Sequence, residues 1–243
     1  QQRAAELDAQ ARRLGLINRV STRVSESLDP EEIYQTALHE LQAVLGAQYG
    51  GVIIYEDEAT GLLVLDTHPQ AGAEPQDLRI TLRDNPSVEQ VRRTQRPLVA
   101  RDVMTDPRFE LDRPVLSQRG TRALMVIPLI VGDEVIGSIG LDFTAPREFT
   151  EAEIELAGTI ASQVSLALDK ARLLREAEQR AGELNQQAQR LAFLNRLSAR
   201  LAETLDPGEL YRIVLTELQD ALGAQYGGLM LLQDGGTISR LVL

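Results

Sequence analysis

Small and apolar residues recur every three or four positions through the stretch from Glu151 to Leu205. This stretch contains no proline and only two glycines, Gly158 and Gly182, and it is rich in Ala, Leu, Glu, Gln and Arg, which favour helix. It is far longer than the helices of an ordinary globular domain. The pattern therefore predicts one long helix that connects domains or forms a coiled coil.

From residue 174 onward the spacing alternates between three and four, as in a heptad seam. A seam this narrow is typical of helix pairing, because a core helix needs a wider apolar face. We therefore expect Asp169–Leu191 to pair with the same segment of a second copy in a parallel two-stranded coiled coil. An asparagine at the next seam position either fixes the register or faces its own domain. The seam residues are Leu174, Ala177, Ala181, Leu184, Ala188, Leu191 and Asn195.

Shorter apolar runs, separated by Gly, Pro and Asp, precede the long helix. A helix is expected over Glu31–Leu45, where Asp29 is the N-cap and Glu32 completes a capping box. Thr150 and Glu153 are expected to cap the long helix in the same way. The opening segment to residue 28 is predicted to be helical. The predicted strands are Tyr49–Tyr55, Leu62–Asp66, Arg79–Arg83, Pro97–Val103, Arg122–Val131 and Glu134–Thr144, and the predicted short helices are Ser87–Arg96 and Val115–Arg119.

The chain also repeats itself, because residue n matches residue n+177. When Gln2–Asp57 is aligned with Gln179–Asp234, 31 of 56 positions are identical. The match includes the helix before the globular part, so the repeated unit is a helix followed by a domain. The second copy stops at Leu243, and we expect it to be incomplete. Its tail from about Ala224 is predicted to be poorly ordered or aggregation-prone, because its strands have only each other as partners.

Composition sets limits on partners and location. A net charge of −11, without any run of basic residues, opposes binding to nucleic acid or to anionic membranes. The longest apolar run, Ala123–Val131, is too short to cross a bilayer. The N-terminal residues lack the apolar core of a signal peptide. A cytoplasmic protein with no membrane and no nucleic-acid partner is expected.

Four blocks follow one another in an informative order: LDPEEIYQTALHELQAVLGAQYGGVIIYED, DVMTDPRF, RALMVIPLIVGDEVIGSIGLDF and FTEAEIELAGTIASQVSLALDKARL. Together they resemble the GAF domain family. The resemblance implies an α+β fold, with an antiparallel sheet of about six strands and helices on both faces. The expected organisation is a helix over 1–28, a GAF domain over 29–150, a connecting coiled-coil helix over 151–205 and the start of a truncated second GAF domain over 206–243.

Such domains usually stand in tandem upstream of histidine kinases and other output domains. The resemblance therefore implies a non-catalytic sensory module of a two-component system, most readily a sensor histidine kinase. It would bind a small molecule or relay a conformational signal through a dimeric helix. The alternative is a ligand-free dimerisation spacer whose pocket is filled by its own side chains. The sequence contains no recognisable nucleophile–base pair or phosphate loop, so this chain itself is not expected to be an enzyme.

The residue types in the sequence limit which cofactors the chain could bind. The absence of cysteine excludes a covalently attached bilin and an iron–sulfur cluster. The lysine-containing signature of cyclic-nucleotide binders is missing, because the only lysine, Lys170, lies on the long helix. Haem would need His39 or His68 as its axial ligand, but both are expected to be solvated. Two isolated histidines also make no metal site. The identity of any ligand stays open.

The resemblance places a pocket under the middle loops. We expect it to be bounded by Leu82–Val91, Val99–Asp102, Phe109–Gln118 and Ala123–Pro128. Arginines gather in this region, where they would clamp an anionic ligand or form a network of surface ion pairs. The candidate ligand-binding residues are Arg101, Asp102, Phe109, Arg113, Arg119, Arg122 and Met125.

Overall fold

The structure, a computed structural model, describes residues 15, 17–69, 78–202, 206–233 and 237–242. It divides into two compact units, Gln1–Leu174 and Arg175–Leu243. The boundary falls inside the 52-residue helix α5 (Glu151–Ala202). The long helix predicted from the sequence is therefore confirmed over the described residues, whereas residues 203–205 lie outside them.

The first unit is built on one antiparallel sheet of six strands in the order β3-β2-β1-β6-β5-β4. This topology confirms the predicted α+β fold. The predicted hairpin pairs the central strand β6 with its neighbour β5, and Gly132 lies at the turn in a left-handed conformation (φ 61°). The strands are β1 (Tyr49–Tyr55), β2 (Thr60–Asp66), β3 (Leu78–Thr81), β4 (Leu98–Ala100), β5 (Ala123–Val131) and β6 (Glu134–Phe143).

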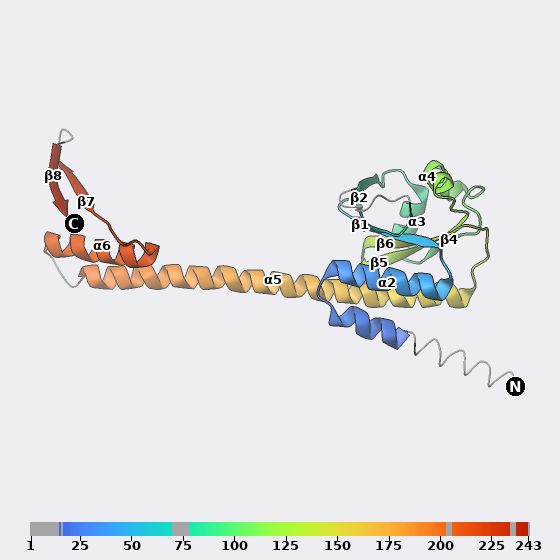
Figure 1. Cartoon of the computed structure of the whole chain (residues 1–243), viewed down its shortest axis with the longest axis horizontal. Helices are drawn as coiled ribbons and strands as arrows, with labels where there is room; N and C mark the ends of the chain where they lie inside the picture. The colour runs from blue at the N-terminus through green and yellow to red at the C-terminus, as the bar shows by residue number, and fades with distance from the viewer. Residues whose placement is uncertain (1–14, 16, 70–77, 203–205, 234–236, 243) are drawn as a thin grey trace. The chain divides into compact units, whose positions relative to one another are not determined.

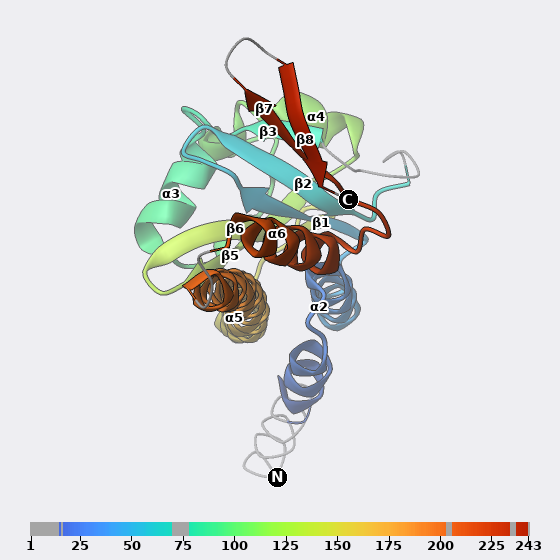
Figure 2. The ribbon, with the colours of Figure 1, turned by 90° about the vertical axis from the view of Figure 1, so that its left-hand side faces the viewer.

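Helices cover both faces of this sheet (Figures 1 and 2). On one face, α2 (Pro30–Leu45), the first part of α5 and the helical residues 17–26 enclose the main core. On the other face lie α3 (Pro86–Thr94), the 3₁₀-helix η1 (Pro107–Phe109) and α4 (Arg113–Gln118). These shorter elements bury a second, smaller cluster.

Strand β5 separates the two layers, because successive side chains of a strand point to opposite faces. Met125, Ile127 and Leu129 are fully buried in the core with α2 and α5. Leu124 and Val126 face the side of α3 and α4. A bulge interrupts the pairing of β5 with β6 at Leu129–Ile130.

The predicted helix caps are largely confirmed. Asp29 accepts a hydrogen bond from the backbone N–H of Glu31, and Thr150 and Glu153 form a reciprocal capping box. The expected role of Glu32 is wrong, because its carboxylate accepts a hydrogen bond from Ser27 instead. Strand β4 is also shorter than the predicted strand Pro97–Val103, because the chain turns into the loop before η1.

In the second unit, α6 (Pro207–Leu222) lies 177 positions after α2 and repeats its ends. Asp206 caps it through the backbone N–H of Gly208, and Gly223 ends it in a left-handed conformation (φ 64°). The strands β7 (Leu229–Gln233) and β8 (Thr237–Val242) pair with each other. A helix followed by a strand hairpin thus comes after α5, as α2, β1 and β2 come earlier in the chain; that they begin a second copy of the domain stays a prediction. The predicted disorder of the tail stays a prediction.

Candidate functional site

A cavity of about 400 Å³ lies between the sheet and the layer formed by α3, η1 and α4. This volume is within the range of sites that hold small molecules. Its walls are mainly apolar. They come from Ile53, Leu63, Leu78, Ile80, Leu82, Val88, Phe109, Val115, Leu116, Leu124 and Val126.

Small residues at the centre of the sheet keep this cavity open. Gly51 of β1 pairs with Gly140 of β6, and both line the cavity together with Ser138. A Cβ atom added at Gly51 would meet the carbonyl oxygen of Leu65 at 2.9 Å, so only glycine fits there. A Cβ atom added at Gly140 would meet its nearest heavy atom, the oxygen of Gly51, only at 4.0 Å. The space beside Gly140 is therefore empty.

An ion-pair cluster forms the polar end of the cavity. The guanidinium of Arg119 donates to both oxygens of Asp66, at 2.6 and 2.9 Å, and to Asp142 Oδ2 at 3.0 Å. The two carboxylate side chains are only 4% and 8% exposed. Burial raises the pKa of Asp142, and the neighbouring Arg119 opposes this rise. Two acids and one base leave this cluster with a net negative charge when both acids are ionised.

His68 stabilises this end of the cavity. Its Nε2 atom lies 3.0 Å from the carbonyl oxygen of Arg119, and its ring packs edge-on against Tyr49 with the centroids 4.5 Å apart. His68 is buried, so the expectation that it is solvated is wrong. The hydrogen bond and the ring contact account for its burial. His39 is exposed on α2, as expected.

A third carboxylate lies where η1 meets α4. Both oxygens of Asp112 accept hydrogen bonds from the side-chain amide of Asn85, at 2.9 and 3.1 Å. Asn85 Oδ1 in turn caps α3 and accepts a hydrogen bond from the hydroxyl of Ser87. Burial raises the pKa of Asp112. Asp112 forms no ion pair with any residue that the structure describes.

The structure brings two of the seven predicted site residues to the cavity, Phe109 and Arg119. Met125 lies in the core on the opposite face of β5. The other four residues are engaged elsewhere. Arg101 pairs with Glu148, Arg122 pairs with Asp102, and Arg113 donates to the backbone oxygen of Asp106.

Of the four segments expected to bound the pocket, Val99–Asp102 contributes no lining residue, whereas the other three all contribute. Sequence reasoning missed the polar lining that comes from β2 and β6. Asp66, Ser138 and Asp142 lie on the cavity face of these strands. The sequence does carry a signal for this polar lining: Ser138, Gly140 and Asp142 stand at alternate positions of one strand, so they share one face.

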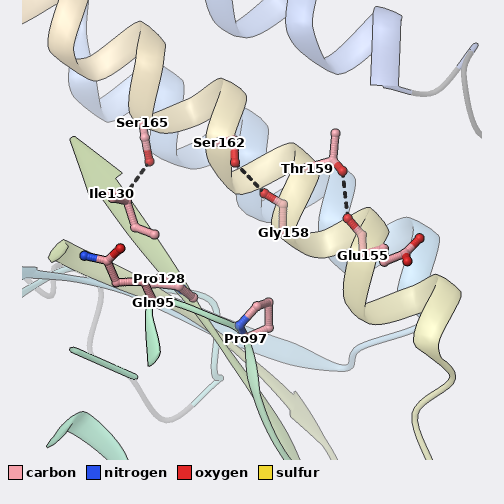
Figure 3. A pocket seen from close by; sticks show the side chains of 9 residues that line it. All are labelled: Gln95, Pro97, Pro128, Ile130, Glu155, Gly158, Thr159, Ser162 and Ser165. Carbon is pink, nitrogen blue, oxygen red and sulfur yellow. Dashed lines mark hydrogen bonds between the residues drawn. The ribbon is translucent and has the colours of Figure 1, made fainter. Parts of the chain in front are cut away.

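A second depression, a groove of about 380 Å³, lies between α5 and the β4–β5 edge (Figure 3). Small residues of α5, among them Gly158 and Ser162, form its helical wall, and Pro97 and Pro128 form the opposite wall. The hydroxyls of Thr159 and Ser162 donate to carbonyl oxygens of their own helix. The groove holds no buried charge, so the cavity is the stronger candidate site.

The described residues offer neither a metal centre nor a membrane span as a further candidate. They contain no group of three metal-ligating side chains placed to hold an ion. None of their helices combines the length and apolarity needed to cross a bilayer.

Comparison with known proteins agrees with this architecture. The family model described as the GAF domain matches residues 29–168. A putative methyl-accepting chemotaxis protein of Synechocystis sp. is 25% identical over 206 residues. That match covers 83% of this chain but only 20% of the relative, so the chain spans about a fifth of that protein's length.

Solved structures share the fold. The GAF domain of a phosphoenolpyruvate-protein phosphotransferase from Coxiella burnetii has a TM-score of 0.59 at 18% identity, covering 68% of this chain and 96% of that one. A phycoerythrobilin-bound GAF domain from a cyanobacterial phytochrome has a TM-score of 0.58 at 19% identity, covering 68% and 99%. A crystallised segment of a methyl-accepting chemotaxis protein has a TM-score of 0.55 at 20% identity, covering 64% and 98%. At these identities the likeness concerns the fold alone.

Proposed function

Because the chain belongs to the GAF domain family, we propose that it binds a small molecule in the cavity and passes the state of that cavity to α5. Its family and its chemotaxis relative make it a sensory or regulatory module. The ligand, the relay and the pairing of two copies are our proposals. No catalytic step is part of this function.

The open cavity is the observation that carries the proposal. A spacer domain would fill this space with its own side chains, as close-packed protein interiors do. Here Gly140 stands where a larger side chain would enter the cavity, since a Cβ added there would meet its nearest heavy atom only at 4.0 Å. The cavity also combines apolar walls with a few polar groups, as is typical of ligand sites. These features favour a sensor over the ligand-free spacer.

Strand β5 supports a route from the cavity to α5. Leu124 and Val126 line the cavity. The alternate residues Met125 and Ile127 point to the opposite face and pack in the core with α5. A ligand that displaces the cavity side of β5 would therefore move the surface on which α5 rests. Close packing transmits such displacements instead of absorbing them.

The seam of α5 supports pairing with a second copy. In the single chain all seven seam residues are exposed, including Leu174 (40%), Leu184 (65%) and Leu191 (61%). Burying large apolar side chains of this kind against a partner helix is favourable. We propose a parallel homodimer through this seam, with Asn195 available to set the register.

We propose that this module regulates either a histidine kinase, as tandem GAF organisation suggests, or a chemotaxis transducer, as the Synechocystis relative's name suggests. The repeated helix and hairpin after α5 support a second GAF domain following the first.

Native mass spectrometry of the whole chain tests the ligand proposal. The protein is incubated with a small-molecule extract of bacterial cells and compared with a Gly140→Val variant. The valine side chain would occupy the cavity without a backbone clash, because the nearest heavy atom to the new Cβ is 4.0 Å away. A bound mass on the unaltered protein that is absent from Gly140→Val supports the sensor.

Gly158→Ala is the matched control, because it adds a methyl group to the groove of Figure 3 and not to the cavity. Its new Cβ would contact Pro97 at an ordinary 3.6 Å. This variant should keep the bound mass. Loss of the mass in Gly158→Ala but not in Gly140→Val would move the binding site to the groove and contradict the proposal.

A further inference from the structure

We propose that the cavity selects a small organic cation: an apolar body carrying a protonated amine or amidinium group, which ion-pairs with Asp112. This inference rests on the proposed function, since it names the ligand class of the same cavity. It also reverses the expectation of an anionic ligand clamped by arginines. The reversal comes from the way the charged residues of the lining are paired.

The arginine at the polar end of the cavity is already paired with two acids, which use three of its five N–H groups. Both terminal nitrogens of Arg119 are occupied, one by Asp66 and the other by Asp66 and Asp142. An incoming carboxylate or phosphate would find only the Nε–H and the second Nη1–H of Arg119, unless it displaced a buried acid from this arrangement. It would also meet the excess negative charge of the cluster, at a site where low dielectric strengthens repulsion.

Acceptor atoms, by contrast, are available. Asp142 is 5% exposed and lines the cavity, and its Oδ1 accepts no hydrogen bond from any described residue. Asp112 accepts hydrogen bonds from the neutral amide of Asn85 but has no cationic partner among them. Burying a carboxylate without a counter-charge is costly. A ligand that supplies the counter-charge would recover this cost.

Two hydroxyl donors of the lining, those of Tyr55 and Ser87, are used within the protein. The hydroxyl of Tyr55 lies 3.3 Å from that of Ser138, and the hydroxyl of Ser87 donates to Asn85. The carboxylates of Asp112 and Asp142 are therefore the charged groups of the lining that can accept hydrogen bonds from a ligand with N–H donors. Arg79 at β3 is the other cation of the lining, and it pairs with Glu56 through two hydrogen bonds. The rest of the wall is apolar, which suits an aromatic or branched aliphatic body.

Three probes with the same aromatic body separate charge from shape: phenethylamine, phenethyl alcohol and phenylacetate. Each is titrated into the whole ¹⁵N-labelled chain, and the amide signals of Gly51, Ser138 and Gly140 report the cavity. We expect the amine to bind with millimolar affinity, at least tenfold more tightly than phenylacetate. In Asp112→Asn the affinity for the amine should fall about tenfold, while that for the alcohol stays within twofold.

The outcomes separate the two proposals. Equal affinities for the three probes, tighter binding of phenylacetate, or an unchanged amine affinity in Asp112→Asn would each overturn the cation preference. In those cases the cavity would still be a binding site. If none of the three probes moves the cavity signals, the cation preference is overturned as well. The sensor proposal falls only if the native mass spectrum also shows no bound mass.

Discussion

The hydroxyl oxygen of Ser165 on α5 lies 2.8 Å from the backbone nitrogen of Ile130 on β5 and accepts its hydrogen bond (Figure 3). The same hydroxyl donates to the carbonyl oxygen of Ala161. Strand β4 pairs with β5 only as far as Val126, so no strand of this sheet takes the place of Ser165 at the bulge. One side chain therefore ties α5 to the strand that also lines the cavity.

Replacing this hydroxyl should loosen α5 from the sheet. We expect Ser165→Ala to destabilise the first unit by about 1–3 kcal/mol, because it leaves the N–H of Ile130 without its partner. Urea denaturation measures the loss. Ser162→Ala is the matched control, since the Ser162 hydroxyl donates only to the carbonyl oxygen of Gly158 in the same helix. Equal stability of the two variants would contradict the assigned role of Ser165.

The Arg119 cluster should be the most sensitive charged group of the domain. Arg119→Met leaves Asp66 and Asp142 buried without their cation, and losing one partner of a buried ion pair costs about 3–5 kcal/mol. Thermal or urea unfolding checks this value. The control is Arg101→Met, because Arg101 and Glu148 are 71% and 74% exposed, and an exposed pair contributes about 0–1 kcal/mol. Similar losses of stability in both variants would contradict the conclusion that the Arg119 ion pairs are buried.

Asp112→Asn should raise stability at neutral pH, because burial raises the pKa of this carboxyl group. A raised folded-state pKa means that the ionised side chain disfavours the folded state at pH values above that pKa. We expect a gain of about 2–4 °C in Tm at pH 7, which corresponds to roughly 1 kcal/mol.

This gain should shrink as the pH falls through the raised pKa and vanish below the ordinary value of 3.8. Scanning calorimetry across this range makes the comparison. A gain that does not change with pH would assign the effect to packing instead of charge. A gain in stability together with a loss of amine affinity would identify Asp112 as a binding residue kept at the expense of stability.

If two copies pair through the seam, a single charge placed in it should weaken the dimer. Leu184→Glu places a carboxylate in the proposed interface and should raise the dimer dissociation constant at least tenfold in sedimentation equilibrium. Gln186→Glu adds the same charge at another exposed position of α5, outside the seam, and should leave the constant within about threefold. A monomer at tens of micromolar in the unaltered chain, or equal effects of both changes, would contradict pairing through this seam.

The sequence predicted the fold well because the fold is encoded locally. Proline after Asp29, glycine at position 132 and the Thr150–Glu153 pair mark element boundaries through short-range hydrogen bonds and turn geometry. The family resemblance supplied the order of the elements. The predicted strand Tyr49–Tyr55 was confirmed residue by residue, because its β-branched and aromatic residues favour a strand despite the two glycines.

The site was less predictable because charge pairing is a property of the tertiary structure. Arg119 is separated by 53 residues from Asp66 and by 23 from Asp142, and only the register of β2 and β6 brings them together. The number of arginines near the pocket therefore suggested an anionic ligand. The acids that pair with Arg119 lie on strands β2 and β6, to which the sequence analysis had assigned no polar role. Met125 was assigned to the wrong layer for a related reason, since the face of a strand depends on its register.

The amide spectrum of the cavity strands tests the central claim most directly, because it reports binding at named residues. A fragment library is screened against the labelled chain, and the signals of Gly51 and Ser138 are followed in the unaltered protein and in Gly140→Val. We predict a set of compounds that move both signals in the unaltered protein and leave them unmoved in Gly140→Val. A cavity that no compound enters, or compounds that act equally on both proteins, would contradict the claim that this domain senses a small molecule there.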